Sequence, residues 1–283
     1  PKSCGGPMFR RGGNAGRCSP LHLRSVRIKC PAMSQRPEPR QLTVLRRDRI
    51  TPSLQRVTLG GPGLAGFPAD QEGGYLKLFL GEAENGKPII RTYTIRHQRD
   101  GELDIDFALH GGEAAGPATK WSLTAEPGSR ITVGGPGAAK PLATGHDFYL
   151  IAGDMTALPA ISVNLAALPP GARGVAAIEI QNEADKLELD KPDGVEIRWL
   201  VNREPGSQPD LLVDALRNVD LPEGQLAAWA ACEFSSMRNL RAFLRDDLGL
   251  RGESLYISSY WKAGLIEDEH KLAKREDAEA QPA

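Results

Sequence analysis

Hydrophobic and polar residues alternate in short runs between Arg40 and about Lys140, and Gly, Pro and Asp residues separate these runs. A period of two is that of a β-strand, whose successive side chains point to opposite faces. The runs cover residues 42–45, 55–59, 75–80, 89–95, 103–109 and 130–133. Short strands at this spacing predict a small antiparallel β-barrel, interrupted by one helix that begins near Pro117.

The pattern changes to an alternation of strands and helices after Pro141. We expect strands over residues 148–153, 175–180, 195–201, 226–231 and 254–258. We expect helices over residues 156–168, 210–217 and 235–248. This order is typical of an open parallel α/β nucleotide-binding domain with a five-stranded sheet. The predicted organisation is a β-barrel domain over residues 34–140, an α/β domain over residues 141–259 and a charged helical tail over residues 260–283.

The first 33 residues differ in composition from the remainder of the chain. Residues 1–32 are rich in Gly, Pro, Ser and Arg and hold three of the four cysteines. They carry seven basic residues and no acidic one, so a net charge of -1 for the chain leaves -8 on residues 33–283. We expect residues 1–33 to be a disordered or non-native extension before a native start at Met33, with a transit-like segment or a basic arm as alternatives.

Composition limits the classes of function that fit the chain. Hydrophobic residues make up 40% and charged residues 25%, as in a globular protein. No run approaches the roughly 18 apolar residues that cross a bilayer, so we expect no membrane insertion. A body of charge -8 binds nucleic acid poorly. Cys232 is the only cysteine after residue 33, so we expect no disulfide and a cytoplasmic location.

The segment Arg91-Thr92-Tyr93-Thr94-Ile95-Arg96 carries the most specific candidate chemistry. On a strand, Arg91, Tyr93 and Ile95 share one face, and Thr94 presents a hydroxyl beside them. A guanidinium neutralises a pyrophosphate, an aromatic ring stacks on an isoalloxazine, and a hydroxyl binds a polar atom at the ring edge. The segment therefore fits a flavin site, and an ordinary barrel strand with a surface Arg fits these residues about as well.

A glycine-rich turn, His110-Gly111-Gly112, is followed by a predicted helix start at Gly116-Pro117-Ala118-Thr119. The first N–H groups of a helix lack intrahelical partners and carry partial positive charge, so a pyrophosphate can bind there. The alternative is a hairpin loop whose glycines only permit a turn. We expect Trp121, in the same helix, to lie in the core.

Two segments fall at the carboxyl ends of predicted parallel strands, where open α/β sheets bind ligands. Gly153-Asp154-Met155-Thr156 ends the first of these strands, and Ala231-Cys232-Glu233 ends the fourth. The Thr156 hydroxyl can contact a phosphate, or Asp154 and Thr156 can simply cap the helix. Cys232 either faces the same crevice or is a small buried residue.

The segment Tyr260-Trp261-Lys262-Ala263-Gly264 follows the last predicted strand. Its aromatic rings can lie across a flavin and its ammonium can meet an anion; the alternative is that the aromatics pin the tail to the body. His270 and Lys271 are expected on a solvated face of the tail. The sequence has no Cys/His cluster with metal-ligand spacing, no G-x-S-x-G and no Walker A motif.

Five motifs occur in one order along the chain. They are Arg91-Thr92-Tyr93-Thr94-Ile95-Arg96, Asp106-Phe107-Ala108-Leu109-His110-Gly111, Gly116-Pro117-Ala118-Thr119-Lys120-Trp121, Gly153-Asp154-Met155-Thr156-Ala157-Leu158-Pro159-Ala160 and Tyr260-Trp261-Lys262-Ala263-Gly264. Together they resemble the siderophore-interacting protein family of FAD-dependent ferric-siderophore reductases, in the ferredoxin-reductase-like superfamily. The resemblance covers about residues 40–275. It implies a Greek-key barrel that binds FAD, an α/β domain for NADH or NADPH, and cytoplasmic reduction of a ferric siderophore without a catalytic acid or base.

The resemblance also implies roles for individual residues. The implied cofactor-binding residues are Arg91, Thr92, Tyr93, Thr94, Ala108, His110, Gly116, Ala118, Thr119, Asp154, Thr156, Glu233 and Trp261. The implied siderophore-binding cations are Lys262 first, then Arg130, Lys77 and Lys271. Two residues depart from the family pattern, Cys232 where a glycine is common and Met155 where a glutamate is common.

The electron donor is left open by the residues. Acids in the segment Gln181-Asn182-Glu183-Ala184-Asp185 favour the ribose hydroxyls of NADH, whereas Arg203 favours NADPH. A ferredoxin is a further possible donor, and we expect a monomer. The rival functions are a general NAD(P)H-dependent flavin or ferredoxin-type oxidoreductase and a non-catalytic siderophore-binding flavoprotein.

Overall fold

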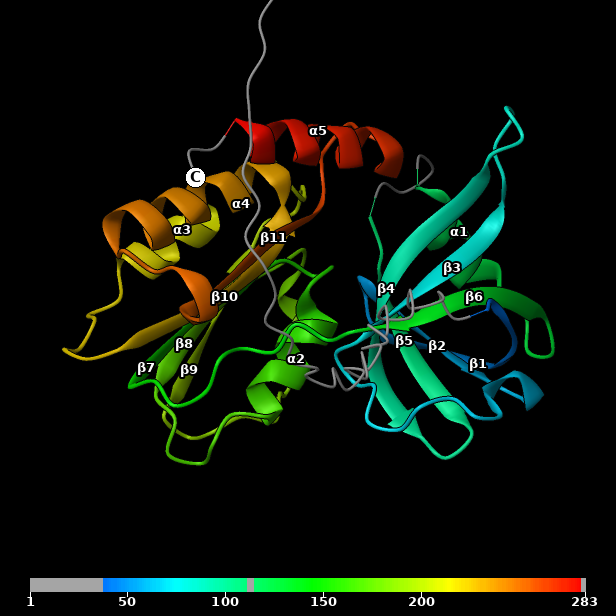
Figure 1. Cartoon of the computed structure of the whole chain (residues 1–283), viewed down its shortest axis with the longest axis horizontal. Coiled ribbons are helices and arrows are strands. Elements are labelled where there is room, and N and C mark those ends of the chain that lie inside the picture. The colour runs from blue at the N-terminus through cyan, green and yellow to red at the C-terminus, as the bar shows by residue number, and fades with distance from the viewer. Residues whose placement is uncertain (1–37, 111–114, 281–283) are drawn as a thin grey trace, which may run out of the picture. The chain divides into compact units, whose positions relative to one another are not determined.

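The computed structural model describes residues 38–110 and 115–280, and its first part is a closed antiparallel barrel (Figure 1). The strands of the barrel are β1 (Arg40–Thr51), β2 (Leu54–Gly60), β3 (Tyr75–Glu82), β4 (Pro88–Arg99), β5 (Glu102–Ala108) and β6 (Arg130–Gly137). Their order around the barrel is β1-β2-β5-β4-β3-β6, and β6 closes it by pairing with both β1 and β3. Because β2 pairs with β5 and not with β3, the connection is a Greek key. The extension expected over residues 1–33 and the turn glycines Gly111 and Gly112 lie outside the described residues.

Alternate residues of each barrel strand fill the interior. On β5 the inward residues are Leu103, Ile105 and Phe107, each at most 1% exposed. The strands extend beyond the hydrophobic runs that predicted them. β1 continues through the exposed segment 45–49 because its backbone stays paired with β2 there. Backbone pairing needs no hydrophobic side chain, so the periodicity marked only the buried part of this strand.

The predicted helix is α1 (Pro117–Thr124), which packs on the barrel. Its Trp121 ring lies 5.6 Å from the Phe107 ring, between ring centroids, so the expectation that Trp121 belongs to the core is confirmed.

The second part is a five-stranded parallel sheet with helices on both faces, which confirms the predicted fold class. Its strands are β7 (Phe148–Gly153), β8 (Gly174–Ile180), β9 (Val195–Val201), β10 (Leu226–Glu233) and β11 (Leu255–Trp261), in the order β11-β10-β7-β8-β9. Its helices are α2 (Leu158–Ala166), α3 (Leu211–Arg217), α4 (Phe234–Arg241) and α5 (Glu267–Glu279). A π-helical turn, Ala242–Asp247, extends α4, and short 3-10 helices lie at Pro62–Leu64, Glu183–Asp185 and Gly252–Ser254.

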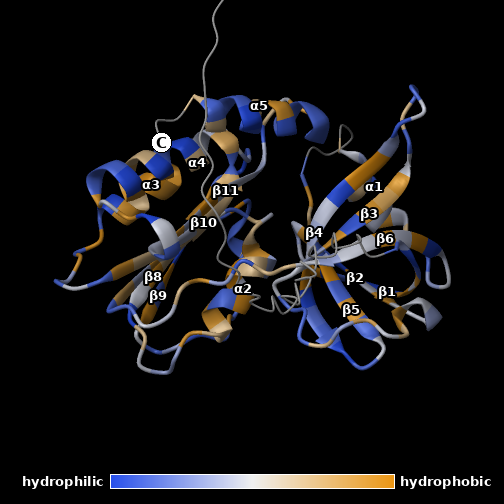
Figure 2. Ribbon diagram, viewed as in Figure 1, coloured by the Kyte–Doolittle hydropathy of each residue, from blue (hydrophilic) through white to orange (hydrophobic). Residues whose placement is uncertain are grey.

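Two hydrophobic clusters cover the two faces of the sheet. One packs α3 and α4 on their face, and the other packs α2 on the opposite face. The α2 cluster also contains Leu54 and Ala108 of the barrel, so the hydrophobic core runs continuously from the sheet into the barrel. Figure 2 shows hydrophobic residues along the strands of the sheet and mostly polar residues on α5. No helix in the described part of the chain is long and apolar enough to span a bilayer.

The tail helix α5 is docked on the α/β part through polar contacts. His270 is only 6% exposed, and its Nε2 lies 2.8 Å from the Ser259 hydroxyl. The expected solvated face is therefore wrong for His270, whereas Lys271 is exposed as expected. Lys274 donates to the Ser258 hydroxyl at 2.7 Å, and Arg241 binds Asp277 with two hydrogen bonds. Hydrophobic patterning cannot detect such an anchor, because His270 is held by a hydrogen bond and by the Phe234 ring and not by an apolar stripe on α5.

Candidate active site

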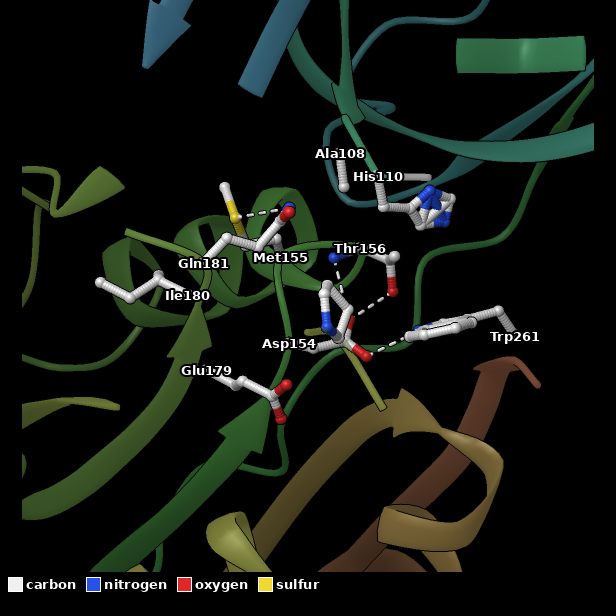
Figure 3. Close-up of a pocket in the computed structure, with 10 residues that line it drawn as sticks. Ala108, His110, Asp154, Met155, Thr156, Glu179, Ile180, Gln181 and Trp261 are labelled. Atoms are coloured by element: carbon white, nitrogen blue, oxygen red, sulfur yellow. Dashed lines mark hydrogen bonds between the residues drawn. The ribbon is translucent and has the colours of Figure 1, made fainter. Parts of the chain in front are cut away.

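A small pocket lies where the carboxyl edge of the parallel sheet meets the end of β5 (Figure 3). Its barrel wall is formed by Ala108 and His110. Its other wall is formed by Asp154, Met155, Thr156, Glu179, Ile180, Gln181, Pro205 and Trp261. Ligands of open α/β sheets bind at this edge. Five residues of the predicted cofactor set thus meet around one space, namely Ala108, His110, Asp154, Thr156 and Trp261.

Asp154 is the polar centre of this pocket. It is 5% exposed, and its Oδ1 accepts hydrogen bonds from the Thr156 backbone N–H at 2.9 Å and from the Thr156 hydroxyl at 2.5 Å. Its Oδ2 accepts from the Glu233 N–H and the Trp261 indole N–H, both at 2.8 Å. Burial raises the pKa of Asp154, and these hydrogen bonds oppose the rise. One carboxylate therefore fixes the loop after β7 and the ends of β10 and β11.

Trp261 spans the pocket between the sheet and the barrel. It is the last residue of β11, whereas the sequence placed it after that strand. Its ring meets the His110 ring edge-on, with 5.5 Å between centroids, while its indole N–H is held by Asp154 (Figure 3). Burial lowers the pKa of His110, which favours a neutral imidazole beside the indole. The placement of Trp261 as a pocket wall fits the predicted role beside a flat ligand better than that of a tail anchor.

Glu179 is a pocket residue that the sequence analysis missed. It is 5% exposed, and its Oε1 accepts from the Asn202 side-chain amide at 2.9 Å. Burial, reinforced by the charge of Asp154, raises the pKa of Glu179 to about 7. A signal for it was present, because a single acid inside the otherwise apolar strand Gly174–Ile180 is unusual for a buried strand.

Glu233 and Cys232 do not line the pocket. The Glu233 carboxylate accepts from the backbone N–H groups of Ser235 and Ser236 and so caps α4, and it also accepts from Ala263 N–H at 3.1 Å. Both carboxylate oxygens of Glu233 are therefore engaged by backbone N–H groups, so this side chain stabilises the segments next to the pocket. Cys232 is fully buried in the α3/α4 cluster, which confirms the reading of a small buried residue.

The predicted flavin strand is β4, and its residues point as alternation requires. Arg91 and Tyr93 lie opposite Leu78 and Leu76 of β3, and the Tyr93 ring lies 4.3 Å from that of Phe107. Ile95, on the same face, is fully buried in the barrel core. The barrel core therefore contains Ile95 and packs against Tyr93, and the residues from Arg91 to Thr94 are the part of β4 that we consider for a cofactor.

Arg91 is half-buried, and its Nε lies 3.5 Å from Oε2 of Glu267 at the start of α5. No other carboxylate in the described residues lies within salt-bridge distance of this guanidinium. A guanidinium in this position has donors for an anionic ligand once the carboxylate gives way.

The start of α1 fits a phosphate group. Gly116 precedes the helix, no side chain caps it, and its first turn contains no acid. A Cβ at Gly116 would meet no atom of the described residues within 4 Å, so none of them crowds this position. Ala118 and Thr119 are at most 5% exposed, so their contribution to a ligand is their backbone N–H groups. An uncapped helix start and a half-buried guanidinium are each a kind of donor that suits the pyrophosphate of FAD.

The four candidate siderophore cations have different surroundings. The Lys262 ammonium lies 4.4 Å from the centroid of the Phe234 ring, and Lys271 binds Glu267 at 3.1 Å. Lys77 is exposed on β3 opposite Thr92, the exposed neighbour of Arg91. Arg130 begins β6, and Val133 of this strand pairs with Leu78, the β3 partner of Arg91. One strand, β3, therefore separates Arg130 from the flavin strand β4.

The two acids after β8 have different surroundings. Asp185 is fully buried and accepts from Thr51 and Ser53 of the barrel, while Glu183 pairs with Lys186 at 2.5 Å. Buried Asp185 therefore no longer supports the sequence argument for NADH, whereas Glu183 is exposed and still does.

Comparison with known proteins gives matches to both the barrel and the α/β part. The family model described as Siderophore-interacting protein matches residues 146–264, and the model described as Siderophore-interacting FAD-binding domain matches residues 43–88 and 81–140. The ferric vibriobactin reductase ViuB of Vibrio cholerae is 34% identical over 255 residues, which cover 83% of this chain and 93% of that protein. An NADPH-dependent ferric-chelate reductase of Escherichia coli is 29% identical, with 79% and 93% covered.

Among solved structures, the siderophore-interacting protein SipS of Aeromonas hydrophila is similar with a TM-score of 0.75 and 33% identity, covering 86% of this chain and 98% of SipS. Family models match both the barrel and the α/β part, and relatives above 30% identity align over most of their length. This chain therefore belongs to the siderophore-interacting protein family.

Proposed function

We propose that this protein is a ferric-siderophore reductase in which NADH or NADPH reduces bound FAD, and FAD passes electrons to the siderophore's Fe(III). The observation that carries the proposal is the pocket between His110 at the end of β5 and Asp154, Thr156 and Trp261 at the sheet edge. A flavin on the barrel and a nicotinamide at the sheet edge would meet there. We assign FAD to residues 34–140 and the nicotinamide donor to residues 141–259.

Residues of the barrel bind and orient the cofactor in this proposal. Arg91 and the open start of α1 neutralise the pyrophosphate, and the Tyr93 ring, backed by Phe107, supports the isoalloxazine. When bound, FAD accepts a hydride and releases electrons singly, chemistry that no side chain supplies. The protein contributes position and exclusion of water, so no side chain needs to act as an acid or base.

Residues at the sheet edge bind the donor. Thr156 and Gln181 offer polar groups to the nicotinamide, and Trp261 offers a flat apolar surface. Arg203 is exposed directly after β9 and is the cation available for a 2′-phosphate, which supports NADPH as one donor. The relative in Escherichia coli is NADPH-dependent by name.

The substrate is an Fe(III) chelate with hard oxygen donors. Reduction to Fe(II) weakens such a chelate because its donors suit Fe(III), so the iron is released. The body of this chain is acidic, so a negatively charged chelate must be drawn by local cations, for which we propose Lys262, Lys77 and Lys271. Two further assignments belong to the proposal, a monomeric state and a cytoplasmic location in which Cys232 remains a thiol.

The test is an anaerobic two-step assay on the FAD-loaded protein. NADH and NADPH are added separately, and bleaching of the flavin absorbance is expected with at least one of them. Addition of a ferric siderophore should then restore the oxidised spectrum, while a ferrous chelator traps Fe(II). A protein that bleaches but is not reoxidised by any ferric siderophore would be an oxidoreductase of another kind, and one that never bleaches would be a non-catalytic flavoprotein.

Lys262→Ala separates substrate binding from cofactor binding. We expect a higher KM for the ferric siderophore with unchanged flavin content, because the ammonium is removed while the flavin site is untouched. Arg130→Ala is the matched control, since Arg130 begins β6, a strand that does not pair with β4.

A further inference from the structure

Asp185 forms a buried contact between the α/β part and the barrel. It lies in the 3-10 helix that follows β8 and has no exposed surface. Its Oδ1 accepts from the hydroxyl of Thr51, the last residue of β1, at 2.6 Å and from the N–H of Ser53, in the following turn, at 2.8 Å. Its Oδ2 has no hydrogen-bond partner in the described residues. A buried carboxylate with one unsatisfied oxygen costs folding free energy, so its presence suggests a role other than stability.

The contact continues as a chain of hydrogen bonds that returns to the α/β part. The Ser53 carbonyl accepts from Leu109 N–H at 2.9 Å, and the Leu109 carbonyl accepts from the Gln181 side-chain amide at 2.7 Å. Gln181 lies four residues before Asp185 in the same segment. We call the residues Thr51, Ser53, Leu109, Gln181 and Asp185 the junction ring.

The junction ring holds the two walls of the pocket together. Leu109 lies between Ala108 and His110, which form the barrel wall, and Gln181 belongs to the opposite wall (Figure 3). Leu109 is gripped on both sides, by Ser53 through its N–H and by Gln181 through its carbonyl. A change at Asp185 or Thr51 would therefore alter the separation of the walls without touching a bound ligand.

From this geometry we propose that Asp185 and Gln181 are positioning residues that set the distance between the flavin and the nicotinamide for hydride transfer. The inference rests on the proposed function. Hydride transfer requires reacting atoms about 3–3.5 Å apart, and a misplacement of about 1 Å can slow a reaction about 100-fold. The α2 cluster also crosses this boundary, and the junction ring adds directional hydrogen bonds to its packing.

The experiment compares Thr51→Val and Asp185→Ala with a matched control inside the barrel. Thr58 is also fully buried, and its hydroxyl donates to the Asp104 carboxylate at 2.7 Å, but both residues belong to the barrel. Thr58→Val therefore removes the same kind of bond at no domain boundary. Each FAD-loaded variant is mixed anaerobically with saturating NADPH or NADH, and the rate of flavin reduction is followed by stopped flow.

We expect flavin reduction to slow about 3- to 10-fold in Thr51→Val and more than about 10-fold in Asp185→Ala. Flavin content should be retained, and dithionite-reduced protein should be reoxidised by ferric siderophore at the wild-type rate. Both Thr58→Val and Thr51→Val should have a lower melting temperature than the wild type, but the flavin of Thr58→Val should be reduced at the wild-type rate.

Reduction of Thr51→Val at the wild-type rate would overturn the inference, and so would an equal slowing in Thr58→Val. If Asp185→Ala does not fold, the comparison of the two Thr→Val variants still decides. If the wild-type protein itself is not reduced by either nicotinamide, the proposed function fails and the inference falls with it. These outcomes are separated by the wild-type trace alone.

Discussion

Replacing Glu267 by Gln should tighten the binding of FAD. In the structure Glu267 stands 3.5 Å from the Arg91 guanidinium, which we assign to the pyrophosphate. The pyrophosphate and the carboxylate are both anions, so they compete for Arg91 and repel each other. A neutral amide at this position removes both effects while keeping the shape of the side chain.

The size of the effect follows from distance and exposure. Two unit charges 3.5 Å apart at an effective dielectric constant of about 20 interact with about 5 kcal/mol, which is an upper bound. Glu267 also pairs with Lys271 at 3.1 Å, and the Glu267 and Arg91 side chains are 17% and 23% exposed. Partly exposed pairs contribute about 1 kcal/mol, so we expect the Kd for FAD to fall about 5-fold.

The assay is titration of the apoprotein with FAD, followed by the change in flavin fluorescence, at low and high salt. The gain should shrink at high salt because the competition is electrostatic. Asp268→Asn is the matched control, because Asp268 is the next acid on α5 and pairs with Lys271 but not with Arg91. Arg91→Ala should purify largely without flavin. Unchanged or weaker FAD binding in Glu267→Gln would refute the reasoning and would mean that Glu267 orients Arg91 for the cofactor.

Three other changes test the pocket and the sheet. Glu179→Gln should gain stability relative to the wild type as pH rises from 5 to 8. The pKa of Glu179 is raised from 4.5 to about 7 in the folded protein, so only the wild type must ionise a buried carboxyl in this range. Urea unfolding should show that the free-energy difference between variant and wild type changes by about 2–3 kcal/mol between the two pH values, and a constant difference would contradict the prediction. Trp261→Phe should cost about 2 kcal/mol in the same unfolding assay, because buried Asp154 loses one donor. Gly153→Ala should lower the melting temperature measured by circular dichroism, because the new Cβ would stand 2.6 Å from the Ala231 carbonyl oxygen. Overpacking of this kind costs about 1–3 kcal/mol. An unchanged Tm would show that the strands can separate there.

The fold was predictable because its core obeys simple periodicities. Strands β7 and β9 match the predicted ranges 148–153 and 195–201, since their residues alternate or run apolar without interruption. The prediction ended the last strand at residue 258, because the polar Ser258 and Ser259 interrupt the apolar run before Tyr260 and Trp261. Strand boundaries depend on backbone pairing, which side-chain patterns report only in part.

The site was predictable to the extent that its residues lie at strand ends. Asp154 and Thr156 follow a strand that any α/β reading places at the ligand edge, and they do line the pocket. The role of Asp185 was not predictable, because its partners Thr51 and Ser53 are more than 130 positions away in sequence. A local pattern cannot identify a contact between two domains, so this acid was interpreted as a nicotinamide ligand when its neighbours were unknown.

The acidic lining of the pocket has a consequence for turnover. A nicotinamide that has given up its hydride carries a positive ring charge, whereas the reduced form does not. Asp154 and Glu179 would therefore hold the spent dinucleotide more firmly than the fresh one, and increasingly so above neutral pH as Glu179 ionises. Under the proposed function, departure of the used donor rather than electron delivery to iron would then limit throughput in a cell rich in oxidised dinucleotide.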